Sequence, residues 1–235
     1  MELSGKKVTV VGTGISGIGA VGLLNAVGAE VVLYDGNEKL KIEDIEKKLG
    51  TYKAEIVLGE LTKELTDSSD LLVISPGVPI DSPVVKAFEA AGVPVWGEVE
   101  LAYAFDKGKV LAITGTNGKT TTTALVGQIV GAYHKDTFVV GNIGNPYTTE
   151  VLKSNKDSYT VAEISSFQLE TVHEFHPLVS AILNITPDHL NRHYTMDCYV
   201  QTKEKIAMNQ KGAEVCVLNF DDDYLREFGE HTTAK

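Results

Sequence analysis

Two glycine-rich loops constrain this chain more than any other feature, because each follows a short apolar segment and precedes a helical one. The first loop, Gly12-Thr-Gly-Ile-Ser-Gly17, follows residues 8–11, and the second, Gly115-Thr-Asn-Gly-Lys119, follows residues 109–114. A tight turn from a buried strand into a helix is typical of parallel sheets that helices cover on both faces. The sequence therefore predicts an α/β fold built from two such units.

The rest of the chain continues this alternation of strands and helices. In the first unit we expect strands at 8–11, 30–34 and 70–75, extended chain at 93–96, and helices at 18–27 and 83–91. In the second unit we expect strands at 109–114, 136–140, 158–164, 179–183 and 214–218, and helices at 120–132 and 196–210, before a polar tail after 223. We predict a Rossmann-like domain at 1–97 and an ATP-binding α/β domain at 98–235.

Charge and composition exclude several classes of protein. The chain has 21 Lys and Arg against 32 Asp and Glu, a formal net charge of −11, so it lacks the excess of basic residues expected of a nucleic-acid binder. Its two cysteines, Cys198 and Cys216, match neither a disulfide scaffold nor a zinc site. We find no apolar run near the ~20 residues that span a bilayer and no signal peptide, so we expect a cytoplasmic protein without membrane insertion.

The first loop fits the pattern G-x-G-x-x-G, in which glycines let the backbone approach a diphosphate at a helix N-terminus. Asp35 ends the next strand, where an acidic residue binds a ribose hydroxyl in dinucleotide folds. An NAD(P)-dependent oxidoreductase is one interpretation, and a turn without a ligand is another. A full dinucleotide fold needs two mononucleotide halves, and a different nucleotide motif begins at 115. The loop therefore favours another diphosphate, such as a UDP-sugar.

The second loop is typical of ATP binding, because its backbone N–H groups can surround phosphates. Lys119 is expected to contact the β and γ phosphates, and the Thr120 hydroxyl to hold Mg²⁺. The spacing departs from G-x-x-x-x-G-K-[ST], since position 113 is Ile. A nucleotide-binding module without catalysis remains an alternative. The predicted ATP-binding residues are Gly115, Thr116, Asn117, Gly118, Lys119, Thr120 and Thr121.

This shorter loop resembles the ATP loop of the Mur ligase family, and four further segments resemble its D-glutamate-adding branch. These segments are 162–170 (AEISSFQLE), 141–146 (GNIGNP), 184–193 (NITPDHLNRH) and 75–79 (SPGVP). They occur in the family's order and extend the resemblance over essentially the whole chain. Asn191 stands where the family pattern usually has Asp.

The resemblance implies an ATP-dependent ligase of peptidoglycan precursor synthesis. Such an enzyme phosphorylates the carboxylate of UDP-N-acetylmuramoyl-L-alanine, and the amine of D-glutamate then attacks the acyl phosphate. The implied catalytic residues are Lys119, His189 and Lys203, and Lys203 stands at the family position that carries a carbamylated lysine. The implied Mg²⁺ ligands are Thr120, Glu163, His189 and Lys203.

The implied substrate contacts lie in both units. They are Ile15, Ser16, Gly17, Asp35, Gly36, Asn37 and Gly77 in the first unit and Asn142, Ser165, Gln168 and His189 in the second. The family has three domains, so the resemblance implies an N-terminal fragment that binds the UDP substrate but is inactive alone. A monomer is expected.

Overall fold

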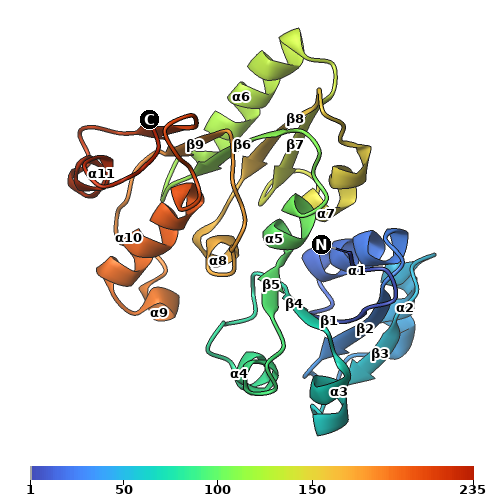
Figure 1. Ribbon diagram of the computed structural model, residues 1–235. Helices are drawn as coiled ribbons and strands as arrows, with labels where there is room; N and C mark the ends of the chain where they lie inside the picture. Colours follow the sequence, from blue (N-terminus) through green and yellow to red (C-terminus); the bar gives the residue numbers. More distant parts are fainter. Residues whose placement is uncertain (1) are drawn as a thin grey trace.

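A computed structural model describes residues 2–235, which form two five-stranded sheets whose strand pairs are all parallel (Figure 1). The first sheet has the order β3-β2-β1-β4-β5 and the second β10-β9-β6-β8-β7. In each sheet the strand that precedes a glycine-rich loop has neighbours on both sides. The predicted parallel α/β fold is confirmed.

The first sheet and its helices alternate along residues 7–97. The strands are β1 (Lys7–Val11), β2 (Glu30–Asp35), β3 (Glu55–Leu58), β4 (Leu71–Ile74) and β5 (Val95–Gly97). The helices are α1 (Ile15–Ala26), α2 (Ile42–Leu49), α3 (Lys63–Ser68) and α4 (Pro83–Ala90).

The second sheet follows without a long linker, because α5 (Glu98–Tyr103) begins directly after β5. Its strands are β6 (Lys109–Thr114), β7 (Thr137–Gly141), β8 (Tyr159–Glu163), β9 (Val179–Ile182) and β10 (Val215–Leu218). Its helices are α6 (Lys119–Tyr133), α7 (Tyr147–Glu150), α8 (Ser166–Leu169), α9 (Leu190–His193), α10 (Met196–Glu204) and α11 (Asp223–Gly229), with 3₁₀ turns at Val151–Lys153 and Lys205–Ala207.

Both glycine-rich loops lie where ligands bind in open parallel sheets. In the first sheet β2 and β3 lie on one side of β1, and the strands that come later in the chain, β4 and β5, lie on the other side. In the second sheet β8 and β7 lie on one side of β6, and β9 and β10 lie on the other side. Such a reversal opens a crevice beyond the carboxyl ends of the strands. The topology therefore places the two loops at the two crevices.

One apolar core joins the two sheets. The helices α1, α5 and α7 contact one another between the sheets (Figure 1), and Val21, Leu101 and Tyr147 are fully buried there. A smaller core, which includes Phe88, covers the other face of the first sheet. The two sheets therefore share buried apolar surface, which favours a fixed arrangement between them.

Several expected elements differ from the structure. The helix expected at 196–210 ends at Glu204 and gives way to the 3₁₀ turn, and α1 begins at Ile15 rather than 18. The tail after 223 is not merely polar, because α11 buries Leu225 against the second sheet. The sequence did not predict several further elements, namely α2, β3, α3, α5, α7, α8 and α9. No helix within residues 2–235 combines the length and apolar character needed to cross a membrane.

Candidate functional site

The first glycine-rich loop is held together by Asp35 at the end of β2. The Asp35 carboxylate accepts bonds from the Thr13 hydroxyl (3.0 Å), the Thr13 backbone N–H (3.3 Å) and the Asn37 backbone N–H (3.1 Å). These contacts bring the loop and the segment after β2 together. Gly36, Asn37 and Gly77 are exposed.

A cavity of about 640 Å³ opens beside this loop. Its walls include Thr13, Ile15 and Tyr52 from the first unit and Asn145 and Pro146 from the second. The Ile15 side chain is 79% exposed. Of the residues predicted to contact substrate in the first unit, only Ile15 is among those that line this cavity, and the others do not line it: Ser16, Gly17, Asp35, Gly36, Asn37 and Gly77.

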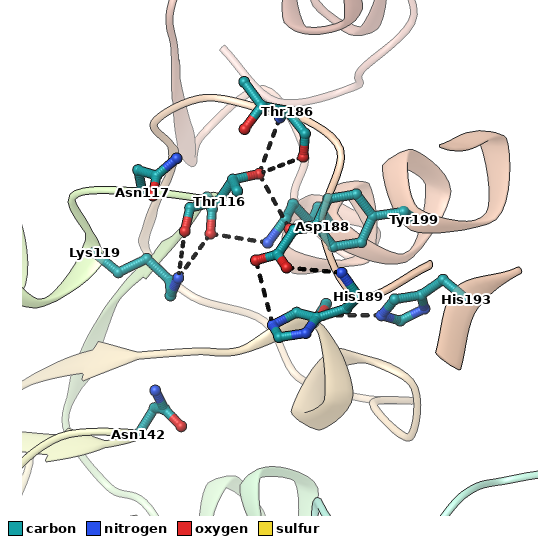
Figure 2. A network of polar contacts seen from close by, with 12 residues as sticks. Thr116, Asn117, Lys119, Asn142, Thr186, Asp188, His189, His193 and Tyr199 are labelled. Carbon is teal, nitrogen blue, oxygen red and sulfur yellow. Dashed lines mark hydrogen bonds and ion pairs between the residues drawn. The ribbon is translucent and has the colours of Figure 1, made fainter. Parts of the chain in front are cut away.

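The second loop turns sharply into α6. Gly118, with φ of 84°, occupies the left-handed region at the position before α6, where a side chain would be strained. The Lys119 ammonium bends back and donates to the Gly115 carbonyl (3.0 Å) and the Thr116 carbonyl (2.9 Å) (Figure 2). Thr120 and Thr121 are exposed at the first turn of α6. The predicted phosphate-binding residues therefore form one compact turn.

The segment after β9, residues 184–186, forms hydrogen bonds with this loop and holds it in place; we call these bonds the Asn184 clasp. The sequence did not predict this role. Asn184 exchanges two hydrogen bonds with the backbone of Asn117, at 2.8 and 3.0 Å. The Thr116 hydroxyl donates to the Thr186 carbonyl and lies 3.1 Å from the Tyr199 hydroxyl (Figure 2). The only sequence signal for this clasp is that Asn184 and Thr186 belong to a motif directly after a strand.

Glu163 ends β8 as a buried carboxylate with one free oxygen. The side chain is 1% exposed, and its Oε1 accepts a bond from the Asn142 amide at 2.8 Å. In the described part of the chain Oε2 is buried and accepts no hydrogen bond. A buried anion of this kind needs a cation or another donor. Carboxylate oxygen is a ligand that Mg²⁺ prefers, so the residue fits the predicted metal site.

The described residues contain no group of three or more His, Cys, Asp or Glu side chains arranged to hold a metal. Magnesium sites often use one or two protein oxygens and take the remaining ligands from water and substrate phosphates. Among the predicted ligands Thr120, Glu163, His189 and unmodified Lys203, only Glu163 carries a carboxylate. Magnesium binding here would therefore depend on the nucleotide.

Lys203 lies buried behind the second loop. Its side chain is 1% exposed, its Nζ donates to the Gly115 carbonyl (2.9 Å), and it lies 4.7 Å from the centre of the Tyr199 ring. Burial, followed by the positive charge of Lys119, lowers the pKa of Lys203 to about 7. No carboxylate within residues 2–235 forms an ion pair with it.

His189 stands at the rim of the same region. Its backbone is left-handed (φ 53°), its ring packs against Phe167, and Nε2 lies 3.5 Å from the Asp188 carboxylate. Figure 2 shows Lys119, Asn142 and His189 around the same region, each from a different segment of the chain. The exposed amide of Asn142 and ring of His189 are thus available to a ligand.

Ser165 and Gln168 form a capping box at the N-terminus of α8. The Gln168 Oε1 accepts from the Ser165 backbone N–H (2.8 Å) and hydroxyl (2.9 Å), and its Nε2 donates to Glu98 (2.6 Å). These bonds use both lone pairs of the amide oxygen and one of the two N–H donors. A substrate contact by Gln168 therefore stays a prediction that depends on the remaining N–H.

His193 is buried one turn beyond His189 and serves the fold. Its Nε2 lies 2.9 Å from the Ser166 hydroxyl. Burial, followed by the positive charge of Arg192, lowers the pKa of His193 to about 4. Arg192 itself pairs with Glu170 and donates to the Val78 carbonyl in the first unit (2.9 Å). This helix therefore also ties the two units together.

We expect the low pKa of His193 to make the chain less stable in acid. Because the folded state holds the ring neutral, the unfolded state binds the extra proton between pH 6.5 and about 4. The contribution is complete above pH 6.5 and is lost as the pH falls, by about 3 kcal/mol in total. Urea unfolding of the 235-residue chain at pH 7.5 and 4.5 measures the loss, and H193Q should reduce it. An equal loss in H193Q would contradict this.

Comparisons with known proteins match both units. A model described as "Mur ligase MurD-like, N-terminal domain" matches residues 6–97, and one described as "Mur ligase middle domain" matches 113–235. The UDP-N-acetylmuramoylalanine--D-glutamate ligase of Lachnospira eligens is 69% identical over 234 residues, which cover 100% of this chain and 52% of that protein. The protein of the same name from Lachnoclostridium phytofermentans is 57% identical and covers 96% and 50%.

Solved structures agree on the fold. The UDP-N-acetylmuramate:L-alanyl-gamma-D-glutamyl-meso-diaminopimelate ligase of Neisseria meningitides superposes with a TM-score of 0.60 at 16% identity, over 99% of this chain and 78% of that one. A murein peptide ligase of Psychrobacter arcticus gives 0.57 at 16%, over 98% and 52%. The chain spans about half the length of the curated relatives it matches.

Proposed function

The chain belongs to the Mur ligase family, and from this premise we propose that it is part of an ATP-dependent ligase that joins D-glutamate to UDP-N-acetylmuramoyl-L-alanine. The names of the two relatives support the choice of these substrates. The two crevices, one in each sheet, support a binding site for one nucleotide in each unit. The observation that carries the proposal is the buried Glu163 with its free Oε2, in the same sheet as the Lys119 loop. Neighbouring β8 and β6 bring the two to the same edge.

In this proposal Lys119 exchanges its bonds to the Gly115 and Thr116 carbonyls for the β and γ phosphates of ATP. The carboxylate of the substrate attacks the γ-phosphorus, so a new P–O bond forms, the bond to the β-phosphate oxygen breaks, and ADP leaves. The D-glutamate amine then attacks the acyl carbon. A C–N bond forms, phosphate leaves, and the amine loses a proton. Both nucleophile and phosphates carry negative charge, so nearby cations lower the barrier.

The Mg²⁺ ligands proposed are the Thr120 hydroxyl, Glu163, His189 and a modified Lys203. When bound, Mg²⁺ neutralises phosphate charge and orients the transferring group. Asn142 supports this arrangement by fixing the Glu163 Oε1, which leaves Oε2 as the available ligand atom.

Carbamylation of Lys203 is the finer part of the proposal. Its neutral amine would attack CO₂, forming an N–C bond and releasing one proton, and the product is an anion with two oxygens. The pKa of about 7 leaves much of the amine neutral at physiological pH, and no carboxylate within the described residues forms an ion pair with it. The carbamate would supply the second anionic ligand that the site lacks.

The UDP portion of the substrate is proposed to bind along the first loop. Ile15, Ser16 and Gly17 would face the diphosphate at the start of α1, and Asp35, Gly36, Asn37 and Gly77 the nucleoside. Ser165, Gln168, Asn142 and His189 would face the sugar and its peptide. We also propose the domain boundary at residue 97, a cytoplasmic location where these nucleotides are made, and a monomer.

Product formation by the full-length protein tests the function. We expect ADP release and an added glutamate mass that require UDP-N-acetylmuramoyl-L-alanine, D-glutamate and MgATP together. The 235-residue chain should bind the UDP substrate without forming the amide. Tight NADH binding without binding of the UDP substrate would overturn the proposal in favour of an oxidoreductase, and nucleotide binding without any product would indicate a module without catalysis.

A further inference from the structure

Glu98 is a buried carboxyl group at the junction between the two units. It is the first residue of α5, directly after β5, and is 2% exposed. Its Oε1 accepts the 2.6 Å bond from the Gln168 amide. In the part of the chain that the structure describes, its Oε2 is buried without a hydrogen-bond partner. No feature of the proposed ligase mechanism uses this residue so far.

Glu98 stands between the two candidate sites. On one side α5, which Glu98 begins, packs against α1, the helix that follows the first glycine-rich loop and contains Ser16. On the other side it holds Gln168, whose amide oxygen binds Ser165, and Ser165 follows the Glu163 carboxylate by two residues. Glu98 therefore lies between the helix that follows the first loop and a chain of hydrogen bonds that leads to the carboxyl end of β8.

The backbone beside Glu98 leaves little room for movement. A Cβ atom at position 97 would overlap the Thr171 hydroxyl, so the junction lies directly against the segment after α8. Close packing of this kind transmits a displacement instead of absorbing it. The position of the junction therefore determines how the first unit faces β8.

Stability alone does not explain Glu98. Burial raises the pKa of this carboxyl group, and the hydrogen bond from Gln168 acts in the opposite direction. The nearby Glu100 contrasts with it, since Glu100 is equally buried but accepts bonds from the backbone N–H groups of 173, 174 and 175. A buried carboxyl group with a free oxygen often costs stability compared with an apolar side chain.

We propose that Glu98 is a positioning residue, which holds the first glycine-rich loop and the β8 end at the separation that a substrate spanning both sites requires. The proposal rests on the ligase function above. Glu98 acts through Gln168 and through the packing of α5 against α1, so its loss should weaken the fit of the UDP substrate and leave MgATP binding intact.

The test uses E98L and E98M in the full-length protein, with E98Q and E100Q as matched variants. Leu and Met fill the space without the hydrogen bond to Gln168, and we expect the KM for the UDP substrate to rise about tenfold. The KM for ATP should change less than twofold, and the melting temperature should stay near the wild-type value. E98Q retains an acceptor for Gln168, so its KM for the UDP substrate should stay near the wild-type value. E100Q should lower the melting temperature and leave both KM values unchanged.

Two sets of results overturn the inference. One is a KM for the UDP substrate within twofold of wild type in E98L or E98M. The other is a rise that E100Q reproduces in proportion to its loss of stability, which would make Glu98 an ordinary structural residue. Both readings require active wild-type protein. If wild type forms no amide at all, the ligase proposal itself has failed, and the two failures are thereby distinguished.

Discussion

Replacing Lys119 by methionine in the full-length protein should lower kcat by about 10³-fold or more, because phosphoryl transfer depends on cations that offset charge in the transition state. Its ammonium is the loop's own cation, and methionine has similar length without charge or donors. The Gly115 carbonyl that it caps keeps its second bond, from Lys203, and Thr116 is partly exposed to water, so the fold should persist. Phosphate release and MgATP titration measure the effect.

The matched control for this change is K109M. Lys109 begins β6, which leads into the same loop, but it is exposed and contacts Tyr159 at the other end of the strand. We expect K109M to keep wild-type turnover, and K119M to retain the affinity for the UDP substrate. Turnover in K119M within tenfold of wild type would contradict the assignment of Lys119.

Replacing Lys203 by methionine should lower kcat by about 10²-fold to 10³-fold, because the site would lose its second anionic ligand. Activity of the wild type should also depend on CO₂. With a pKa of about 7, the reactive neutral amine increases as the pH rises through 7. After removal of CO₂, reactivation at a constant concentration of dissolved CO₂ should therefore be faster at pH 8 than at pH 6.

The control for this change is K211M, since Lys211 is exposed in the turn before β10. It should keep full activity and the same response to CO₂, whereas K203M should show no response. Mass spectrometry under mild conditions should find one added CO₂ that K203M lacks. Unchanged activity of the wild type after removal of CO₂, checked by mass, would rule out the carbamate.

The strands that the sequence predicted are those with strong apolar runs. β1 and β6 lie in the middle of their sheets, so most of their residues are buried, and three of the five residues of β1 and four of the six of β6 are apolar. β3 escaped prediction because it is a four-residue edge strand whose side chains are only partly buried. The helix that ends at Glu204 was overestimated because the residues after it remain helix-compatible, and a 3₁₀ turn with buried Ile206 and Ala207 replaces it.

The site was predictable where motifs follow strands, and unpredictable where distant side chains meet. The loops at 12 and 115 follow β1 and β6, so their place at the carboxyl edge could be inferred from the alternation of elements. The Asn184 clasp and the pairing of Glu98 with Gln168 join residues about 70 positions apart. Neither pairing produces a periodicity or spacing in the sequence, so only the fold reveals them.

The order of strands has a consequence for how the protein folds as it is made. All five strands of the first sheet come from residues 7–97, so this sheet can form before the second is synthesised. In the second sheet β6 lies between β8 and β9, which emerge about 50 and 70 residues later. Contacts this distant along the chain form slowly. During synthesis, β6, the strand that precedes the phosphate loop, therefore stays unpaired until β8 and β9 have emerged. Mutations that slow the pairing of β9 with β6 should favour aggregation rather than simple loss of activity.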